Sequence, residues 1–332
     1  MIVIEQRASS ILYKFLVSNC KGRHFLMPAN VCPVVPLTFL KANIDFSFVD
    51  IDPTTHAGSY KEYIDALKQV GDNNGILYVN AYGFKKNNTE FYSEIKRLYP
   101  NIVVIEDNCL CIPEVSTTEV KQFVDLEFYS NGMSKCAPLE KEGGYGLFDI
   151  DKWEYNDCNE EYVDTAYDEQ RLLLRECRID GLPFTYEDSH WLPLQLTSLS
   201  GVSSAEYLRR VSCSVNRAMK HKKTINDIYD KGLPDTIKYE GVFHNWRYML
   251  MLPNHDLQQT ILSELDKHNL YASAHYASVG FLFKKKHYPI AEKEASFTLN
   301  LFNEQKYTEE MAKQTVEIIN NILIKYDKQR KI

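Results

Sequence analysis

Two segments of the sequence each end in residues that could take part in catalysis. The apolar run Asn101–Ile105 leads to Asp107, whose carboxylate is costly at the end of a buried strand unless it has a partner. The run Leu126–Tyr129 is followed by Ser130 and, after a turn of small residues, by Lys135. Alone, the aspartate would indicate only a turn cap. Together, the carboxylate, the hydroxyl and the amine at two strand ends indicate a shared site.

These groups fit the requirements of pyridoxal phosphate (PLP). A lysine in an enclosed site can lose its proton and form a Schiff base with an aldehyde. PLP needs such a lysine, here Lys135, a carboxylate on its ring nitrogen, here Asp107, and donors to its phosphate. Ser130, just before the lysine, could reach the phosphate. Gly143 and Gly144 would let the backbone pass close to the cofactor, although alone they would indicate only a tight turn.

The start of a predicted helix offers further donors to the phosphate. Helix N-termini bind phosphate because their first backbone N–H groups have no partner within the helix. Ser9 and Ser10 open a helix that carries Ile11, Leu12 and Phe15. The two serines could therefore supply hydroxyl and N–H groups to the phosphate. The alternative is that they are exposed residues that only cap the helix.

The elements that must position these groups alternate along the first half of the chain. Runs rich in Val, Ile, Phe and Tyr predict strands at His24–Met27, Ile44–Ile51, Gly75–Asn80, Asn101–Asp107, Leu126–Ser130 and Tyr145–Phe148. Helices are predicted between them at Leu37–Asn43, Tyr60–Val70 and Thr89–Tyr99. This alternation predicts an α/β fold with a mainly parallel sheet between helices. Ligands of such sheets bind at the carboxyl ends of the strands.

The second half of the chain has a different pattern. It predicts a long amphipathic helix at Glu206–Asp230, a strand at Val242–Leu252, and helices at Asp256–Leu265 and Met311–Tyr326. We therefore expect two domains, a large PLP-binding domain at residues 1–205 and a smaller C-terminal α+β domain at residues 206–332. The stretch 151–200 is acidic, then aromatic, and gives no clear prediction.

In their order, these features resemble the DegT/DnrJ/EryC1/StrS family of PLP-dependent sugar aminotransferases. The resemblance covers most of the chain and rests on the motifs Arg7–Leu12, Pro28–Pro33, Phe48–Thr54, Tyr78–Gly83, Val104–Asp107, Tyr129–Lys135, Glu142–Gly144, His275–Tyr276 and Tyr307–Glu310. It is carried by the order of these motifs and by the spacing from Asp107 to Lys135. The resemblance implies the fold of aspartate aminotransferase, a fold type I PLP-dependent transferase.

The resemblance also implies a transamination mechanism. Lys135 would hold PLP and move a proton between an amino donor, expected to be glutamate, and the cofactor. Asp107 would keep the ring nitrogen protonated, which makes the ring an electron sink. A keto sugar on a nucleotide carrier would then receive the amino group, for cell-surface polysaccharide or amino-sugar biosynthesis. The family further implies a homodimer whose sites borrow residues from the partner.

Four more residues are linked to the site through the resemblance. Tyr82 could cover the cofactor ring and His275 could contact substrate, although both residue types more often have structural roles. Leu110 stands where the family usually has Gln or His, so we expect altered contacts with substrate or cofactor there. The family's Gly-x-Asn segment is not recognisable. His190, in the stretch Asp188–Trp191, is expected to take its place.

Two alternatives remain open from the sequence. The chain is shorter than typical members of the family, so the acceptor could be a keto substrate without a nucleotide. The chain could also bind PLP without turnover. The presence of Asp107, Ser130 and Lys135 favours an enzyme over this second alternative.

The composition argues against several other classes of protein. The 332 residues are 44% hydrophobic and 25% charged, as in globular proteins, and the net charge of −7 argues against nucleic acid as the main partner. No run approaches the roughly 18 apolar residues of a membrane span, and the N-terminus does not resemble a signal peptide, so we expect a cytoplasmic protein without membrane contact. The eight cysteines lack framework or metal-ligand spacing, so we expect reduced thiols and no metal.

Overall fold

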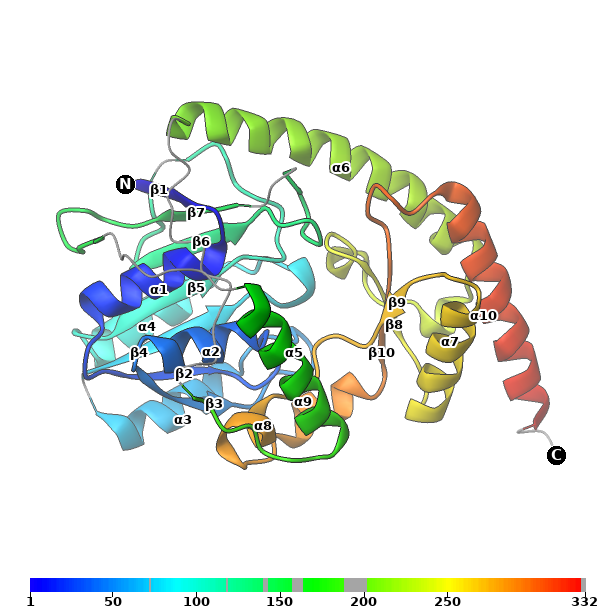
Figure 1. The fold of residues 1–332 in the computed structure, drawn as a ribbon, viewed down its shortest axis with the longest axis horizontal. Helices are drawn as coiled ribbons and strands as arrows, with labels where there is room; N and C mark the ends of the chain where they lie inside the picture. The colour runs from blue at the N-terminus through cyan, green and yellow to red at the C-terminus, as the bar shows by residue number, and fades with distance from the viewer. Residues whose placement is uncertain (72, 118, 140–142, 157–163, 188–201, 330–332) are drawn as a thin grey trace.

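Seven strands of the first half form one sheet in the computed structural model, which describes residues 1–332 except 72, 118, 140–142, 157–163, 188–201 and 330–332 (Figure 1). The strands are β1 (Ile2–Glu5), β2 (His24–Pro28), β3 (Asp45–Val49), β4 (Asn74–Val79), β5 (Val103–Asp107), β6 (Leu126–Ser130) and β7 (Gly144–Leu147). Their order across the sheet is β1-β7-β6-β5-β4-β2-β3.

The sheet is mainly parallel. Strands β2 to β6 pair in parallel with their neighbours, whereas β7 is antiparallel to both β6 and β1. The mainly parallel, mixed sheet that the sequence predicts is therefore confirmed. Strand β1 was not predicted, because four residues at the edge of a sheet carry little periodicity.

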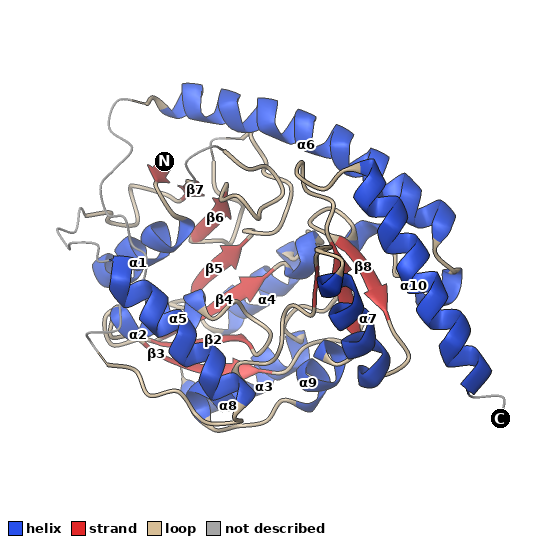
Figure 2. Ribbon diagram, turned by 45° about the vertical axis from the view of Figure 1, so that its right-hand side comes forward, coloured by secondary structure: helices blue, strands red, loops and turns tan. Residues whose placement is uncertain are grey.

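Helices cover both faces of this sheet (Figure 2). They are α1 (Ala8–Asn19), α2 (Val34–Lys41), α3 (Tyr60–Val70), α4 (Thr89–Leu98) and α5 (Asp164–Ile179), with a short 3₁₀ turn at Ala81–Gly83. Side chains alternate along each strand between the two faces. Phe25 and Met27 of β2 pack in the core beneath α1 and α2, whereas Leu26 packs in the core beneath α3 and α4. Burial on both faces explains why these strands are apolar throughout.

The second half of the chain forms a smaller sheet with its own helices. Its elements are α6 (Ser204–Gly232), β8 (Tyr248–Met251), α7 (His255–Lys267), β9 (Ala272–Ser273), α8 (Gly280–Lys284), α9 (Pro289–Ala295), β10 (Thr298–Leu301) and α10 (Glu309–Gln329), with 3₁₀ turns at Asp235–Ile237 and Gly241–Phe243. Strands β8, β10 and β9 pair antiparallel in that order. Helix α6 runs along the top of the molecule and packs against α10 (Figure 1).

The predicted strand at Val242–Leu252 is wrong in its first half. The chain forms a turn at Gly241–Phe243 and becomes extended only from Tyr248. The polar pair His244-Asn245 interrupts the apolar run there, and the apolar residues on its two sides belong to different elements.

The domain boundary near residue 205 coincides with the start of α6 but stays a prediction.

One segment of the second half packs on the first sheet. Val279 and Tyr288 belong to the core beneath α1 and α2. The hydroxyl of Tyr288 donates to the carbonyl of Phe48 at 3.0 Å, and the N–H of Val279 donates to the carbonyl of Ala29 at 2.8 Å. The segment 279–291 is thus part of the first sheet's core, although it lies late in the chain.

The core of the smaller sheet allows a direct stability test. Ile319 of α10 is fully buried against this sheet, whereas Ile324 of the same helix is 54% exposed. Ile319→Ala should lower the free energy of unfolding by about 2–5 kcal/mol, because it removes buried methyl groups and leaves a cavity. Ile324→Ala is the matched control and should change it by less than about 0.5 kcal/mol. Urea unfolding of both variants measures the difference, and equal effects would contradict this packing.

Candidate active site

The carboxyl ends of β5 and β6 open into a cavity of about 500 Å³, which we call the inner cavity. The polar and cysteine side chains on its wall come from α1, α2, α5 and the strand ends, and they include Arg7, Ser9, Cys32, Thr38, Asp107, Cys109, Ser130, Ser134, Lys135 and Arg171. The structure therefore brings together Asp107, Ser130, Lys135 and Ser9, which the sequence predicts for one site.

Asp107 is the last residue of β5 and is only 5% exposed. It lies between parallel neighbours, opposite Val79 of β4 and Phe128 of β6. The backbone N–H of Cys109 donates to its Oδ1 at 2.8 Å. Burial raises the pKa of Asp107, and the hydrogen bonds from Cys109 and the charge of Lys135 offset this only in part. A cationic ligand nitrogen against this carboxylate would favour its charged form.

The wall around Ser130 depends on the two glycines that open β7. Gly143 has a φ of +134°, a backbone angle that residues other than glycine rarely adopt. An added Cβ there would lie 2.5 Å from the Tyr207 hydroxyl. An added Cβ at Gly144 would lie 2.9 Å from the backbone nitrogen of Ala8. It would lie even closer, 2.7 Å, to the carbonyl oxygen of Tyr129 in β6, so β7 closely approaches both β6 and the first residue of α1 at Gly144. This approach brings the N-terminus of α1 to the edge of the sheet beside Ser130.

The N-terminus of α1 faces the inner cavity through two of its residues. Arg7, the N-cap residue, and Ser9 of the first turn both line the cavity. The first N–H groups of a helix are suited to an anion, although here the N–H of Ser10 already donates to the carbonyl of Arg7 at 3.1 Å. Ser10 is fully buried and is not among the described residues that line the cavity. Arg7 is an additional basic group that the sequence did not single out for this role.

A second cavity of about 550 Å³, the outer cavity, adjoins the first. Lys135, Ser134, Cys32, Val34 and Arg171 line both. The remaining wall of the outer cavity is formed by Pro33, Leu37, Leu174, Arg175, Arg178, Ile179, Trp246, Arg247 and residues 273–277. The lysine thus borders one cavity built by the first sheet and one shared with the second half of the chain.

The loop that carries Lys135 is attached to the second half of the chain. The indole Nε1–H of Trp246 donates to the carbonyl of Ser134 at 2.9 Å. The Sγ of Cys136 lies 3.3 Å from the carbonyl of Asn245, as a donor. These contacts on both sides of Lys135 fix where its side chain leaves the backbone.

The three other predicted residues in the described part of the chain lie at or behind the outer cavity. His275 lines it, and its carbonyl accepts a hydrogen bond from the Tyr82 hydroxyl at 2.9 Å. Tyr82 and Leu110 are buried in one cluster with Trp246. Neither is among the described residues that line the two cavities. Their predicted contacts with cofactor or substrate stay predictions, as does that of His190, which lies outside the described residues.

Comparison with known proteins places this arrangement in a known fold. No family model matches the sequence, and no curated protein matches it. Among solved structures, a DegT DnrJ EryC1 StrS aminotransferase from Brucella abortus superposes with a TM-score of 0.65 at 15% identity, over 96% of this chain and 85% of that one. A Streptococcus pneumoniae protein assigned as a sugar aminotransferase, in its PMP form, gives a TM-score of 0.69 at 16% identity, over 100% and 88%.

A third structure, of DesI in the presence of its TDP-sugar product, gives a TM-score of 0.67 at 12% identity, over 96% of this chain and 79% of that one. The chain has the DegT/DnrJ/EryC1/StrS aminotransferase fold. This confirms the fold that the sequence resemblance implies. Within the aminotransferase fold, the inner and outer cavities lie at the carboxyl ends of β5 and β6, where ligands of parallel sheets bind.

The charges around His275 make its titration a test of the outer cavity. Burial, together with the positive charges of Arg247, Arg178 and Lys135, lowers the pKa of His275 from 6.5 to about 4. We therefore expect a neutral imidazole at neutral pH, and protonation only as the pH falls toward about 4. Arg178→Gln removes one positive charge and should raise this pKa toward its ordinary value. NMR titration, with the resonance assigned by His275→Gln, measures both values, and an ordinary pKa in the unmodified protein would contradict the arrangement.

Several residues at these cavities were missed from the sequence. The outer cavity is lined by three arginines of α5, namely Arg171, Arg175 and Arg178. It is also lined by Arg247, the residue just before β8. Spacings of four and three residues place the α5 arginines on one helix face, so their alignment could have been recognised. The position of this helix face near Lys135 could not have been recognised, because it depends on the path of the chain between β7 and α6.

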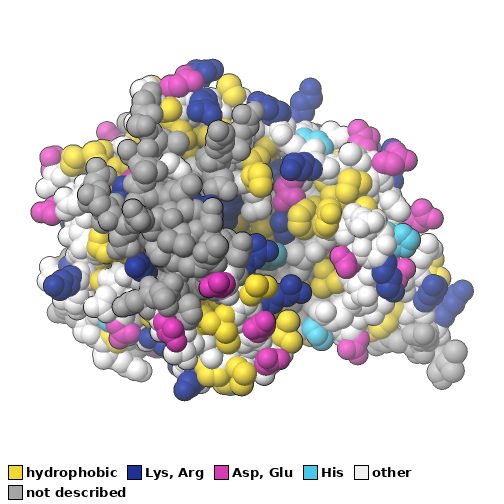
Figure 3. Space-filling model, viewed as in Figure 1, with side chains coloured by type: hydrophobic (Ala, Val, Ile, Leu, Met, Phe, Trp, Pro, Cys, Tyr) yellow, Lys and Arg dark blue, Asp and Glu magenta, His cyan; other side chains and the backbone are white. Residues whose placement is uncertain are grey.

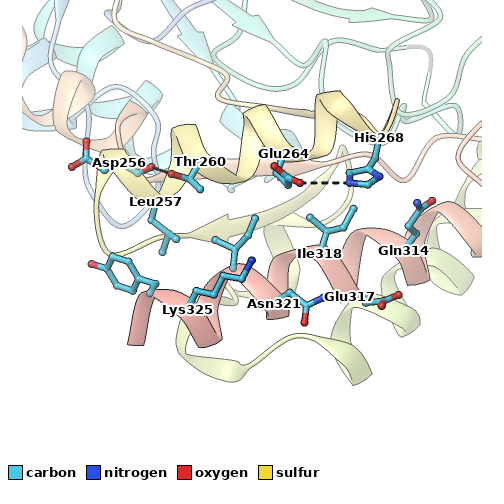
Figure 4. A pocket seen from close by; sticks show the side chains of 12 residues that line it. Asp256, Leu257, Thr260, Glu264, His268, Gln314, Glu317, Ile318, Asn321 and Lys325 are labelled. Atoms are coloured by element: carbon cyan, nitrogen blue, oxygen red, sulfur yellow. Dashed lines mark hydrogen bonds and ion pairs between the residues drawn. The ribbon is translucent and has the colours of Figure 1, made fainter. Parts of the chain in front are cut away.

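Two further cavities of the described chain contain none of the predicted site residues. One, of about 380 Å³, is lined by residues that include Lys85, Glu106, Glu114 and Lys121. A groove of about 760 Å³ between α7 and α10 is lined by polar side chains such as Glu264 and His268, and it contains none of the predicted site residues (Figure 4). The described residues contain no group of three or more His, Cys, Asp or Glu side chains that could hold a metal ion. Within them, no helix combines the length and the apolar character needed to cross a bilayer.

Proposed function

We propose that the chain is a PLP-dependent aminotransferase that transfers an amino group to a keto sugar on a nucleotide carrier. The observation that supports this most is that Lys135, Asp107 and Ser130 line one cavity at the strand ends of an aminotransferase fold. Structures with this fold include a PMP form of a protein assigned as a sugar aminotransferase and DesI with its TDP-sugar product.

The donor set of the inner cavity fits PLP. Arg7, Ser9 and Ser130 lie together with the N-terminus of α1, which suits a phosphate. Lys135 would bond the aldehyde carbon of the cofactor, and Asp107 would face its ring nitrogen. When bound there, PLP supplies an electron sink that makes it easier to remove a proton from the carbon next to the amino nitrogen. A cavity of about 500 Å³ is within the usual range for such ligands.

The side chains of this chain would supply the proton transfers and the enclosure. Lys135 borders both cavities, so its amine can take a proton from a carbon in the outer cavity and return it. Asp107 in its charged form would hold a proton on the ring nitrogen. Trp246 and Tyr276 form an aromatic wall of the outer cavity, and the Trp246 side chain is fixed by its hydrogen bond to Ser134. This wall would keep water from the reacting carbon.

We further propose that glutamate is the amino donor and that the product is used for surface polysaccharide or amino-sugar synthesis. We also propose that the protein is a cytoplasmic homodimer, with domains at residues 1–205 and 206–332. Apolar side chains near the cavities support a second copy of the chain as a partner. Met133, Leu172, Ile179 and Leu182 are each more than half exposed. Apolar side chains that are exposed together as one patch are typical of an interface.

The proposal is tested with the purified protein loaded with PLP. The lysine-bound cofactor should give a visible absorption band that disappears when glutamate is added. A keto sugar linked to a nucleoside diphosphate should restore the band. If only a keto substrate without a nucleotide restored the band, the proposed acceptor would be wrong. If the protein showed no band at saturating PLP, the proposal that it is a PLP-dependent enzyme would be wrong.

A further inference from the structure

The His275–Tyr276 peptide forms part of the outer cavity's wall, where the two halves of the chain meet. Residues 273–277 line this cavity from the second half, and Lys135 lines it from the first. In Figure 3, Lys and Arg side chains gather near the centre of the face shown, between the two halves. Like charges around one space repel one another. The position of this wall therefore depends on contacts that hold the two halves together.

The hydroxyl of Tyr82 makes two hydrogen bonds to this peptide. It donates to the carbonyl of His275 at 2.9 Å and accepts the backbone N–H of Tyr276 at 3.2 Å. Within the described part of the chain, this N–H has no other hydrogen-bond partner. The Nδ2 of Asn300, in β10, donates to the same carbonyl at 3.1 Å. The peptide is thus bound by a residue that follows β4 of the first sheet and by a residue of the second sheet.

The Tyr82 hydroxyl keeps its proton and so stays a donor. The side chain is 1% exposed. Burial, together with the nearby charge of Glu294, raises the pKa of Tyr82 well above its ordinary value. The Oε2 of Glu294 lies 2.5 Å from the Nδ1 of His56, so this carboxylate has a partner of its own. A protonated hydroxyl can donate one hydrogen bond while it accepts another.

The turn that carries Tyr82 is attached to the strand end that carries Asp107. Tyr82 has a φ of +51°, which is uncommon for a residue with a side chain and persists only where the surroundings hold it. The backbone N–H of Asn80, just before the turn, donates to the carbonyl of Asp107 at 3.1 Å. An added Cβ at Gly83 would lie 2.7 Å from the carbonyl oxygen of Leu110. The Tyr82 hydroxyl therefore extends from a backbone that packs against the segment following β5.

We propose that Tyr82 is a positioning residue whose hydroxyl holds the His275–Tyr276 peptide in place relative to Asp107 and so sets the wall against which the substrate binds. This inference rests on the proposed function, which places the substrate in the outer cavity. Tyr82 is not among the described residues that line either cavity, so it acts through the peptide that it binds.

Loss of the hydroxyl should change the outer cavity and leave the inner cavity intact. The rings of His275 and Tyr276 lie 5.8 Å and 5.6 Å from the ring of Trp246, so a shifted peptide would displace this aromatic wall. In Tyr82→Phe, the glutamate concentration that gives half the maximal rate of band loss should rise by roughly tenfold. The maximal rate and the dissociation constant of PLP should stay within about twofold, because Lys135 and the phosphate donors are unchanged.

Two further measurements use the protein without PLP. Hydrogen exchange of the Tyr276 amide, followed by NMR, should become roughly tenfold faster or more in Tyr82→Phe, because the amide loses its acceptor. The amide of Val279 donates to the carbonyl of Ala29 at 2.8 Å and should keep its exchange rate. The pKa of His275 should rise from about 4 toward its ordinary value, because a released ring gains contact with water.

Tyr63→Phe is the matched control. Tyr63 is also fully buried, and its hydroxyl donates to the carbonyl of Leu77 at 2.8 Å, away from both cavities. This variant loses the same kind of hydrogen bond and should leave the Tyr276 exchange rate, the His275 pKa and the glutamate dependence unchanged.

Three results would overturn the inference. The first is a Tyr82→Phe protein in which the exchange rate of Tyr276 does not change. The second is equal acceleration at Tyr276 and Val279, which would indicate a general loss of stability. The third is faster exchange at Tyr276 alone with an unchanged glutamate dependence, because the wall would then not serve the substrate. Failure of the proposed function has a different result, namely no cofactor band in the unmodified protein, whereas the exchange measurements need no cofactor.

Discussion

Replacing Lys135 with alanine should abolish both the visible band of the lysine-bound cofactor and the amino transfer. The amine is the group that bonds the cofactor and the base that moves the proton, and it borders both cavities. Removal of a residue that forms a covalent bond to the reacting system costs roughly 10³–10⁶ in rate. The band is measured by absorption after PLP is added, and the rate is measured with glutamate and a keto acceptor.

A matched lysine variant makes the Lys135 result specific. Lys68 is exposed on α3 and pairs only with Asp65 of the same helix in the described structure. Lys68→Ala should keep the cofactor band and the rate. Thermal unfolding of both variants shows whether the fold is kept. A Lys135→Ala protein that still forms a borohydride-reducible cofactor bond would show that another lysine holds PLP.

Asp107→Asn should lower amino transfer by roughly 10²–10⁴, the second largest expected effect, because a neutral amide cannot stabilise a protonated ring nitrogen. The amide is nearly the same size as the carboxylate, and its oxygen can still accept the N–H of Cys109, so the fold should persist. The rate of band loss with glutamate measures the effect. Burial raises the pKa of Asp107 in the protein without ligand, and a protonated ring nitrogen beside it would favour the charged form of the carboxyl.

The neighbouring Glu106 provides the contrast for Asp107. It lies on the opposite face of β5, where Lys121 pairs with it at 3.0 Å and the Tyr92 hydroxyl donates to it at 3.1 Å. Glu106→Gln should therefore reduce stability and leave the cofactor band in place. If Asp107→Asn and Glu106→Gln had equal effects on the rate of band loss, Asp107 would not have the role assigned to it.

The helices and strands predicted best are those whose own residue types show which of their faces are buried. The predicted strand Leu126–Ser130 has the bounds of β6, because a run that is buried on both faces is apolar throughout. The predicted helix Tyr60–Val70 has the bounds of α3, because its buried residues recur at the helical period and a glycine ends it. Local sequence is enough for elements of this kind.

The parts not predicted depend on contacts between distant segments. Helix α5 lies in the stretch 151–200, for which the sequence yields no clear prediction, although Leu173, Leu174 and Cys177 pack against the first core; its arginines were therefore not linked to the site. Gly144 was interpreted as leaving room for the cofactor, whereas an added Cβ there would meet the backbone of Tyr129 and of Ala8. Ser9 and Ser10 are equivalent in the sequence, but only Ser9 lines the inner cavity. Such differences follow from the direction in which a helix packs on the sheet.

The packing of segment 279–291 on the first sheet has a consequence for the order in which the protein is made. The core beneath α1 and α2 includes Val279, Leu282, Tyr288 and Ala291, which are synthesised after all seven strands of the first sheet. The first sheet can pair its strands earlier, but its apolar surface stays partly open until this segment arrives. A nascent chain of the N-terminal half alone would therefore expose the surface that chaperones recognise.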